Sequence, residues 1–455
     1  MNTDITLKFN TGELKGKKIT FSNHEIVTIG RDVDSCTLGI HRDVDSCTVV
    51  IPKSYQTVSQ IHCTLKIDSP FVIVSDLNSK NGTWLNGDEI GGRAFDFSES
   101  EYKDEEIQST NDFLMKPGDK LILGGFKKNK NGEGKIERCE IELEFINLNE
   151  YFKTENDFLG EGKMGVVKLV KDVNTKCLMA IKILKPNIEG VENNNKERIL
   201  DWFLREFYNG RQINHGNVVK YYYLGLYDGR LATVMEYCPG GNLEKLIDRV
   251  DDNAEFDESL DKKIDLATQI IFQVFDAIDY IHRAAEAKVA LADNRIYITN
   301  GMVHRDIRPD NILLMDDSLE KPVVKVIDLG FTKTYETSGK SDGTFRGEAC
   351  GDWSYVPKQQ VEGYLYAKPE VDVWATFATY YRMLVGIPPK GFIPDNEKKQ
   401  VIERRATDIL EYNSNLPIKL AFVINLGLID DDDDLGIILK EALVAKKLIK
   451  HALNR

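Results

Sequence analysis

The sequence has no long apolar run, no disulfide-type cysteine pattern and no excess of positive charge, and each absence removes a class of protein. No stretch approaches the roughly 20 apolar residues that a membrane-spanning helix requires, and the first residues, MNTDITLKFNTGE, have no apolar core of a signal peptide. The seven cysteines are scattered and form no CxxC pair, which favours a reducing compartment. A net charge of −14 disfavours nucleic acid and anionic membranes as partners. We therefore expect a soluble, cytoplasmic protein, or a nuclear one in a eukaryote.

The pattern of the chain changes near residue 150, which indicates more than one domain. At 455 residues the chain is too long for one hydrophobic core. Up to that point, short β-rich runs such as ITLKF and FVIVSDL alternate with turn signals, as in an all-β sandwich. Beyond it, a β-rich stretch to about residue 185 precedes long helical patterns, which predicts a bilobal α+β domain. The four-residue join, 147–150, spans at most ~14 Å, so we expect the two domains to lie close together.

The most informative stretch is HRDIRPDN, residues 304–311. It places the carboxylate of Asp306 five residues before the amide of Asn311, and a second carboxylate, Asp328, follows seventeen residues later in VIDLG. Phosphoryl transfer needs one group that orients the attacking hydroxyl and oxygen ligands that hold magnesium on the phosphates. Asp306 suits the first role, and Asn311 with Asp328 suits the second. Arg308 has a planar fork that can bind a γ-phosphate bidentately.

These motifs resemble the catalytic and metal loops of the eukaryotic-type (Hanks-type) Ser/Thr protein kinase family. The resemblance covers about residues 151–455, with a small lobe at about 151–236 and a large lobe at about 239–455. It implies transfer of the ATP γ-phosphate to Ser/Thr hydroxyls of protein substrates, with Mg²⁺ (or Mn²⁺) as cofactor. The positions that match the family's ATP-binding residues lie in LGEGKMGVV, AIK, TVMEYC and the segment after the catalytic loop: Leu159, Gly160, Glu161, Gly162, Lys163, Met164, Gly165, Val166, Val167, Ala180, Lys182, Met235, Glu236, Cys238 and Leu313.

The resemblance also assigns supporting roles. Lys182 needs a glutamate partner on the next helix, for which Glu206 is favoured and Glu197 is the fallback. The catalytic set is then Asp306, Lys182, Glu206 and Arg308. His304 is expected to pack and hydrogen-bond instead of acting as a base, Arg305 to pair with a phosphorylated residue, and Asp372 to anchor the backbone of the catalytic loop.

Some positions depart from the family pattern. The chain reads VPKQQ where the family has Ala-Pro-Glu, so the structural glutamate appears as Gln359 or is missing. Gly210 replaces a large apolar residue, and about fifteen extra residues, roughly 284–297, precede the catalytic loop. These departures keep an alternative open: a weak or inactive pseudokinase that acts as a phosphothreonine-binding adaptor. A small-molecule kinase of similar fold is a more distant alternative. The acidic run at residues 430–434 is interpreted as a solvated turn.

The N-terminal domain, residues 1–147, resembles a forkhead-associated (FHA) domain, a β-sandwich that binds phosphothreonine. Three ordered pieces carry the resemblance: Gly30-Arg31 at a strand end, VSQIHCTL and SKNGTWLNG. A phosphate dianion is bound by a guanidinium, a hydroxyl and further donors from adjacent loops. His62 is expected to brace the loop from inside. The positions that match the family's phosphate contacts are Arg31, Ser59, Gln60, Lys80 and Asn81.

The sequence RDVDSCT occurs twice, beginning at Arg31 and at Arg42, so either arginine can hold the phosphate, with Arg31 favoured. An acidic insertion at about residues 91–113 is interpreted as a solvated loop. Together the two domains suggest docking on phosphothreonine proteins or peptides, followed by substrate recruitment or trans-autophosphorylation through transient self-association. The activation segment offers four candidate acceptors, of which Thr344 is favoured: Thr332, Thr334, Thr337 and Thr344.

Overall fold

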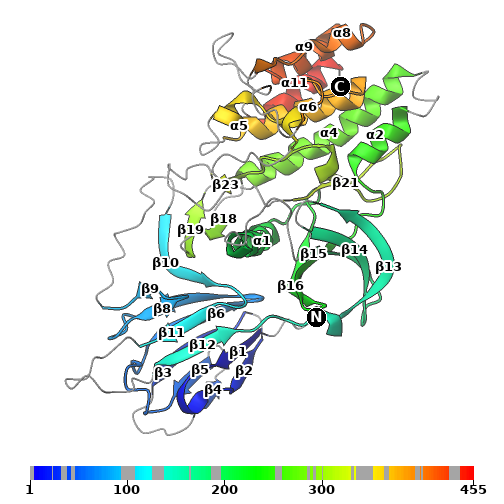
Figure 1. Cartoon of the computed structure of the whole chain (residues 1–455). Helices are drawn as coiled ribbons and strands as arrows, with labels where there is room; N and C mark the ends of the chain where they lie inside the picture. Colours follow the sequence, from blue (N-terminus) through cyan, green and yellow to red (C-terminus); the bar gives the residue numbers. More distant parts are fainter. Residues whose placement is uncertain are drawn as a thin grey trace.

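The computed structural model shows a β-rich N-terminal domain beside a two-lobed C-terminal domain (Figure 1). It describes residues 5–22, 24–31, 38–42, 47–93, 108–124, 138–162, 165–185, 196–251, 259–283, 287–290, 294–299, 301–328, 333–334, 352–362, 368–394, 400, 403–429 and 441–454. The expected fold class, an all-β sandwich followed by a bilobal α+β domain, is confirmed.

The first sheet of the N-terminal domain has the strand order β2-β1-β12-β11-β8-β9. In β1 (Ile5–Phe9), Ile5, Leu7 and Phe9 are buried and the residues between them are half-buried, as expected for a strand with one face on a core. A single hydrophobic core lies between this sheet and the second one. The remaining elements are η1 (Gly12–Leu14), β2 (Lys18–Phe21), β8 (Thr83–Leu85), β9 (Asp88–Gly91), β11 (Lys120–Leu123) and β12 (Cys139–Leu143).

The second sheet contains strands from both domains, in the order β18-β19-β10-β7-β6-β3-β5-β4. Six strands come from the N-terminal domain, whereas β18 and β19 come from the extra residues before the catalytic loop. Its strands are β3 (Ile26–Arg31), β4 (Gly39–Arg42), β5 (Cys47–Ile51), β6 (Cys63–Asp68), β7 (Phe71–Asp76), β10 (Gln108–Met115), β18 (Ala287–Ala290) and β19 (Arg295–Thr299).

The expectation of a solvated loop at residues 91–113 was wrong for its last part. Residues 108–113 belong to β10, which pairs with β7 and β19, and Phe113 is only 4% exposed. The physical reason is the edge of β7: its backbone groups need partners, and β10 supplies them. Residues 94–107 lie outside the described part of the chain.

The small lobe is a five-stranded antiparallel sheet, β13-β14-β15-β17-β16, with helix α1 beside it (Figure 1). The linker joins the domains tightly, because the backbone N–H of Leu226 donates to the carbonyl of Ile146 at 2.7 Å. A Cβ on Gly225 would lie 2.3 Å from that carbonyl, so the close approach requires glycine. The elements are η2 (Leu148–Glu150), β13 (Phe152–Glu161), β14 (Gly165–Asp172), β15 (Leu178–Leu184), α1 (Lys196–Arg211), β16 (Tyr221–Tyr227) and β17 (Arg230–Glu236).

The large lobe is built around α4 (Leu260–Arg283) and α6 (Glu370–Val385), which pack against each other in its core. Two short strand pairs, β20 with β23 and β21 with β22, lie between these helices and the small lobe. The other elements are α2 (Leu243–Asp251), β20 (Met302–Val303), η4 (Pro309–Asn311), β21 (Ile312–Leu314), β22 (Val324–Val326), β23 (Lys333–Thr334), η6 (Trp353–Tyr355), α5 (Lys358–Glu362), α8 (Ile409–Tyr412), α9 (Ile418–Gly427) and α11 (Ala442–Ala452).

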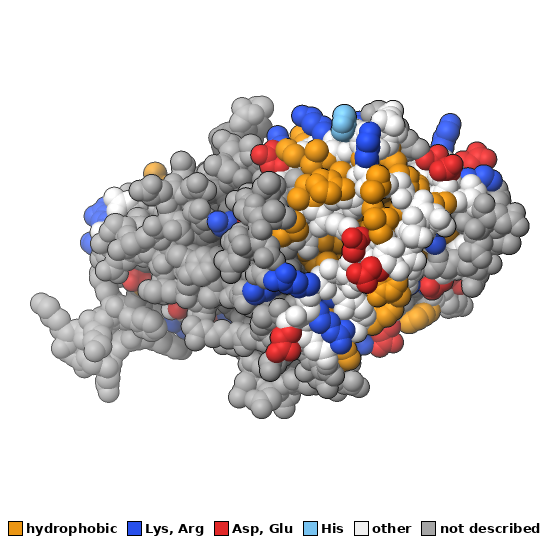
Figure 2. All heavy atoms as spheres, turned by 90° about the horizontal axis from the view of Figure 1, so that it is seen from above, with side chains coloured by type: hydrophobic (Ala, Val, Ile, Leu, Met, Phe, Trp, Pro, Cys, Tyr) orange, Lys and Arg blue, Asp and Glu red, His pale blue; other side chains and the backbone are white. Residues whose placement is uncertain are grey.

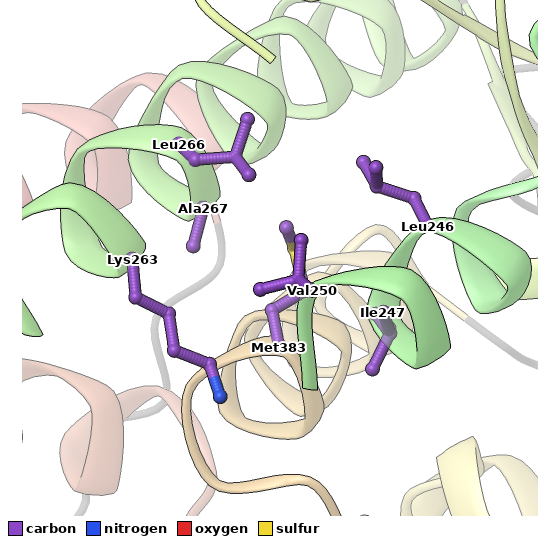
Figure 3. A pocket seen from close by; sticks show the side chains of 7 residues that line it. All are labelled: Leu246, Ile247, Val250, Lys263, Leu266, Ala267 and Met383. Atoms are coloured by element: carbon purple, nitrogen blue, oxygen red, sulfur yellow. The ribbon is translucent and has the colours of Figure 1, made fainter. Parts of the chain in front are cut away.

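Two surface features of the large lobe are apolar. Hydrophobic side chains gather on the face seen in Figure 2, and Tyr412, Ile418 and Phe422 of α8 and α9 are among the exposed ones of this lobe. A small hollow between α2, α4 and α6 is lined by Leu246, Ile247, Val250, Lys263, Leu266, Ala267 and Met383 (Figure 3). Only Lys263 brings a charged group to this hollow, so it resembles imperfect helix packing more than a ligand site. Within the described residues, no helix is both long and apolar enough to cross a membrane.

Gly427, at the end of α9, lies at a close helix contact in the core of the large lobe. A Cβ there would lie 2.2 Å from the ring of Phe377, which is fully buried and packs against Phe275. We expect Gly427→Ala to lower the free energy of unfolding by about 1–3 kcal/mol, because the ring has no room to move. Urea unfolding followed by tryptophan fluorescence measures this. Gly216→Ala is the matched control, since a Cβ there meets no atom within 4 Å. Equal stability of the two variants would contradict the packing.

Candidate functional site

The catalytic loop brings Asp306 and Asn311 together. The amide Nδ2 of Asn311 donates to the backbone carbonyl of Asp306 at 2.9 Å and to its carboxylate Oδ2 at 2.7 Å. Pro309 begins the 3₁₀ turn η4, where its fixed φ and missing N–H are tolerated, and this turn carries Asn311 back toward Asp306. Burial raises the pKa of Asp306 to about 7, although the positive charge of Arg308 and the Asn311 hydrogen bond oppose this. Asp306 is therefore a carboxylate with a high affinity for a proton.

Arg308 lies over the same carboxylate. Its Nε is 3.5 Å from Asp306 Oδ1, and its Nη1 is 3.1 Å from Asp310 Oδ2. Burial disfavours the charged guanidinium, but the carboxylates of Asp306 and Asp310 more than offset this and raise its pKa. Arg308 thus stays fully charged beside the group that would meet the acceptor hydroxyl.

A short hairpin places Asp328 beside Asn311 despite their separation in sequence. β21 starts directly after Asn311, β22 ends two residues before Asp328, and Ile312 pairs with Val326. The backbone N–H of Ile327 donates to the carbonyl of Asn311 at 3.0 Å. Asp328 has a φ of 66°, a left-handed conformation that is uncommon outside glycine and clusters at functional sites.

The donor set here fits Mg²⁺. Nδ2 of Asn311 is engaged by Asp306, so the amide oxygen is the atom of this side chain that could ligate a metal. One amide oxygen and one half-exposed carboxylate are hard oxygen ligands, and Mg²⁺ commonly takes one or two such groups and completes its shell with phosphates and water. The described residues hold no larger cluster of His, Cys, Asp and Glu that suits a metal.

Lys182 on β15 meets two carboxylates. Its Nζ is 3.2 Å from Glu206 Oε1 on α1 and 3.7 Å from Asp328 Oδ1. Burial alone would lower the pKa of Lys182, but the negative charges of Asp328 and Glu206 reverse this and raise it. Burial raises the pKa of Glu206. The positive charge of Lys182 and a 3.3 Å contact with the Tyr221 hydroxyl act in the opposite direction and favour the charged form. Glu197 lies nine residues earlier, about 13 Å along the helix axis, so the structure places Glu206 as the partner.

The residues expected to hold the adenine form one apolar cluster. Ala180, Met235 and Cys238 are buried in it, and Leu159, Val167 and Leu313 pack against them. Burial raises the pKa of the Cys238 thiol to about 12, so the thiol is neutral. Glu236 follows Met235 in the hinge. Its backbone N–H donates to the backbone carbonyl of Lys220, and its carboxylate pairs with Lys325 at 2.8 Å. The sequence reading missed four members of the cluster: Val219, Tyr237, Met315 and Ile327.

The glycine-rich segment closes over this cluster as the β13–β14 turn. Gly160 pairs with Val167 and Glu161 with Val166. A Cβ on Gly160 or Gly162 would meet nothing, whereas one on Gly165 would lie 2.9 Å from the carbonyl of Ile183. Gly165 is therefore required for the close approach of β14 to β15, and the other two leave open space for a phosphate. Lys163 and Met164 lie outside the described residues.

Asp372 on α6 anchors the backbone of the catalytic loop. Its carboxylate accepts from the backbone N–H groups of His304 and Arg305, each at 2.7 Å, and from His282 Nε2 at 2.7 Å. Arg305 has a φ of 70°, and these bonds stabilise that strained backbone. The expected anchoring by Asp372 is confirmed, and His282 is an additional partner that the motif did not reveal.

His304 packs as expected. It is fully buried, its Nε2 contacts the carbonyl of Ile327 at 3.0 Å, and its Nδ1 accepts from the backbone N–H of Asp306. Burial lowers its pKa, so the ring is neutral with the proton on Nε2. It bridges the two loops and is not placed to act as a base.

Residue 360, not 359, takes the buried position after VPK. Gln360 is 3% exposed and its Nε2 donates to the carbonyl of Arg305 at 2.9 Å, while Gln359 is half-exposed. The two neighbouring glutamines differ because one step along α5 rotates the side chain by about 100°. The placement of the lost structural glutamate at Gln359 stays a prediction. Of the candidate phosphorylation sites only Thr334, in β23, is described; Thr332, Thr337, Thr344 and the acidic run 430–434 lie outside the described residues.

The expected phosphate-binding residues of the N-terminal domain converge on adjacent loops. Arg31 ends β3, where its backbone N–H donates to the carbonyl of Ser59 at 2.8 Å and its Nε to that of Val58 at 3.0 Å. The hydroxyl of Ser59 accepts from the backbone N–H of Lys80 at 2.9 Å. Asn81 Nδ2 donates to the carbonyl of Thr57 at 2.8 Å. Gln60 and Lys80 are exposed beside them.

Arg42 and Arg31 lie beside opposite ends of strand β5. It pairs with Cys47 at the start of β5, whereas Arg31 pairs with Ile51 at the end of that strand. The two positions are thus about 13 Å apart along the strand direction, and the side chain of Arg31 contacts the backbone of Val58. Gly30 reinforces this placement, since a Cβ there would overlap the carbonyl of Gln60 at 1.8 Å. Most of the two RDVDSCT copies lies outside the described residues.

His62 braces this site from inside, as expected. It is fully buried, its Nδ1 accepts from the backbone N–H of Ser59 at 2.9 Å, and its Nε2 lies 3.0 Å from the carbonyl of Gly82. Burial lowers its pKa, so the neutral ring joins the loop of Ser59 to the loop of Lys80 and Asn81 without adding charge.

Comparison with known proteins identifies both domains. Residues 153–454 match the model of the protein kinase domain, and residues 27–97 match that of the FHA domain. The SNF1-like protein kinase ssp2 of Schizosaccharomyces pombe is 30% identical over 246 residues, which is 53% of this chain and 35% of that protein. The carbon catabolite-derepressing protein kinase of Candida tropicalis is 30% identical over 243 residues, 53% of this chain and 33% of that protein. The chain thus spans about a third of the length of these relatives, and it belongs to the protein kinase family, with an FHA domain in front of the kinase domain.

Proposed function

We propose that the protein is a Ser/Thr protein kinase that transfers the γ-phosphate of ATP to hydroxyls of protein substrates. The observation that carries the proposal is the position of Lys182, which lies within ion-pair distance of both Glu206 and Asp328. This pairing joins the small lobe to the metal loop, and it is the arrangement that phosphoryl transfer requires. The domain bounds that we propose are 1–147 for the FHA domain and 151–455 for the kinase domain, with lobes at about 151–236 and 239–455.

The residues would share the work as follows. The carboxylate of Asp306 accepts a hydrogen bond from the substrate hydroxyl, orients its lone pair toward the γ-phosphorus and takes up the proton as the bond forms. Its raised pKa of about 7 suits it to receive that proton. Lys182 binds the α- and β-phosphates, and Arg308 binds the γ-phosphate through its fork. Backbone N–H groups of the glycine-rich turn complete the phosphate contacts.

Asn311 and Asp328 would hold Mg²⁺ through oxygen atoms. When bound, the ion neutralises charge that develops on the phosphate oxygens. The chain's own contribution is to fix the two ligands, through the Asn311–Asp306 hydrogen bonds and the β21–β22 hairpin. The adenine would lie in the cluster of Leu159, Val167, Ala180, Met235 and Leu313, with the hinge backbone at Glu236 and Cys238 bonding its edge.

We infer that the FHA domain docks the enzyme on phosphothreonine. The guanidinium of Arg31, the hydroxyl of Ser59 and donors on Gln60, Lys80 and Asn81 converge on one edge of the sandwich, which suits a phosphate dianion. Docking would raise the local concentration of a primed substrate, or of a second copy of this chain, near the active site. Partners of this chemistry are phosphothreonine-containing proteins.

Asp306→Asn is expected to lower phosphoryl transfer by about 10²–10⁴-fold, because an amide cannot accept the proton of the substrate hydroxyl. The measurement is incorporation of labelled phosphate from ATP with magnesium into the protein itself and into a generic protein substrate. Mapping of the modified residues distinguishes Ser/Thr from Tyr.

Asp317→Asn is the control, since this exposed carboxylate lies on the same lobe in the turn between β21 and β22. Binding of ATP to both variants checks that the site is folded. Wild-type protein that binds ATP but incorporates no phosphate would favour the alternative, an inactive pseudokinase that serves as a phosphothreonine adaptor. Residual activity in Asp306→Asn equal to wild type would remove Asp306 from its proposed role.

Arg31→Ala is expected to weaken binding of phosphothreonine peptides by about tenfold or more, because a charge-assisted bond to the phosphate is lost. Arg42→Ala should leave the affinity at the wild-type level, although the two arginines begin identical seven-residue segments. Fluorescence anisotropy with a phosphothreonine peptide library, and with its unphosphorylated counterpart, measures both. The assignment fails if the Arg42 variant, and not the Arg31 variant, loses affinity.

A further inference from the structure

The FHA domain and the kinase domain share one β-sheet. β19, from the extra residues before the catalytic loop, pairs antiparallel with β10 of the FHA domain, and the backbone N–H of Leu114 donates to the carbonyl of Asn294 at 2.7 Å. The guanidinium of Arg295 lies over the ring of Phe113, 5.4 Å from its centre, and both side chains are buried. Backbone pairing of this kind fixes register and orientation, so the FHA domain has a defined position on the kinase.

The helix that carries Glu206 lies at this junction. In Figure 1, α1 lies between strands β10, β18 and β19 on one side and the small-lobe sheet on the other, and it contacts both β18 and β16. The five consecutive residues 206–210 are all buried. At about 100° per residue, five positions in a row span the full circumference of the helix. A helix at the surface of a domain buries one stripe, so burial around so much of α1 requires a second cover. The FHA domain supplies it.

Aromatic packing at Phe71 and polar contacts of Arg211 join the FHA domain to α1 directly. Phe71, at the start of β7, is fully buried and packs edge-on against Tyr208, with ring centres 5.1 Å apart, and at an angle against Phe207 at 6.0 Å. It belongs to the same hydrophobic core as the kinase helices, not to that of the FHA sandwich. In the last turn of α1, Arg211 Nη2 pairs with Asp68 Oδ1 at 3.0 Å, and Arg211 Nη1 donates to the carbonyls of Asp68 and Ser69.

The same helix face leads to the active site. Phe207, which contacts Phe71, also packs edge-on against Tyr221 at 5.9 Å, and the Tyr221 hydroxyl lies 3.3 Å from Glu206 Oε1. Glu206 in turn holds Lys182 at 3.2 Å. A retreat of α1 would lengthen this last ion pair, in which Glu206 is buried and Lys182 is partly buried.

We propose that Asp68, Phe71 and Arg211 are positioning residues for phosphoryl transfer, through which the FHA domain holds α1 so that Glu206 stays paired with Lys182. The inference rests on the proposed kinase activity. It adds that contacts from the FHA domain determine the position of α1. The FHA domain then has two roles, which use opposite ends of strands β6 and β7. The turn that docks on α1 joins β6 to β7, and the phosphate-binding residues Ser59 and Lys80 flank the far ends of these strands, about 20 Å away.

The test is a charge exchange in the full chain. Arg211→Glu places two carboxylates together at Asp68 and should lower kcat on the order of tenfold to 100-fold, through the displaced Lys182–Glu206 pair. Asp68→Arg should have a similar effect. The double variant Asp68→Arg with Arg211→Glu restores an ion pair, though not the bonds from Arg211 to backbone carbonyls, so it should recover part of the loss. Arg249→Glu, on the exposed face of α2, is the control for a surface charge reversal.

Hydrogen exchange of the α1 amides gives a second measurement that does not depend on catalysis. Single variants with faster α1 exchange and lower kcat, both partly restored in the double variant, would support the proposal, provided that phosphothreonine peptides still bind with wild-type affinity. Unchanged α1 exchange in Arg211→Glu would overturn the docking. Faster exchange with wild-type kcat would overturn the positioning role. If wild type shows no kinase activity but α1 responds to the charge exchange, the docking stands and the proposed function is what fails.

Discussion

The rest of the active site depends on the hydrogen bonds that the buried carboxylate of Asp372 accepts. Taking an isolated carboxylate out of water costs several kcal/mol, and here three donors compensate: two backbone N–H groups of the catalytic loop and His282. Burial alone would raise the pKa of Asp372, but these bonds and the neighbouring histidines outweigh it and lower the pKa. The carboxylate therefore stays charged and keeps Arg305 in its left-handed conformation. Without that bend, the chain would not present Asp306 and Asn311 on one side.

From this anchor the site is assembled by short-range connections. His304 joins the catalytic loop to the carbonyl of Ile327, and the β21–β22 hairpin brings Asp328 next to Asn311. Asp328 then meets Lys182, which meets Glu206. Lys182, Glu206 and Asp328 carry charge at low or intermediate exposure, so removing one of them leaves another uncompensated. This series of hydrogen bonds, strand pairing and ion pairs from α6 to α1 explains why the small lobe, the metal loop and the catalytic loop must be correct together.

Local motifs predicted this part of the fold because their geometry is local. HRDIRPDN folds into a single turn, and Gly30, Arg31 and His62 are fixed by neighbouring strand ends, so residue type and spacing contain most of the information. The rest depended on tertiary structure. Strand β19, which begins in the insertion, pairs with the polar strand β10 because the backbone groups along one edge of each need partners, and no periodicity reveals this. Gln360 is buried and Gln359 is half-exposed because helix phase, set by packing of α5, decides which side chain faces inward.

The shared sheet also changes how the two domains are understood. A flexible link would let the FHA domain act only as a tether, whose effect depends on local concentration. Here the linker lies against β16, β19 continues the FHA sheet, and Phe71 is part of the kinase core. The free energy of unfolding α1 therefore includes contacts from the FHA domain. Because the proposed phosphate-binding loops flank the opposite ends of β6 and β7, a phosphothreonine bound there would not compete with the α1 contact. The two proposed roles of the FHA domain thus use opposite ends of one sandwich.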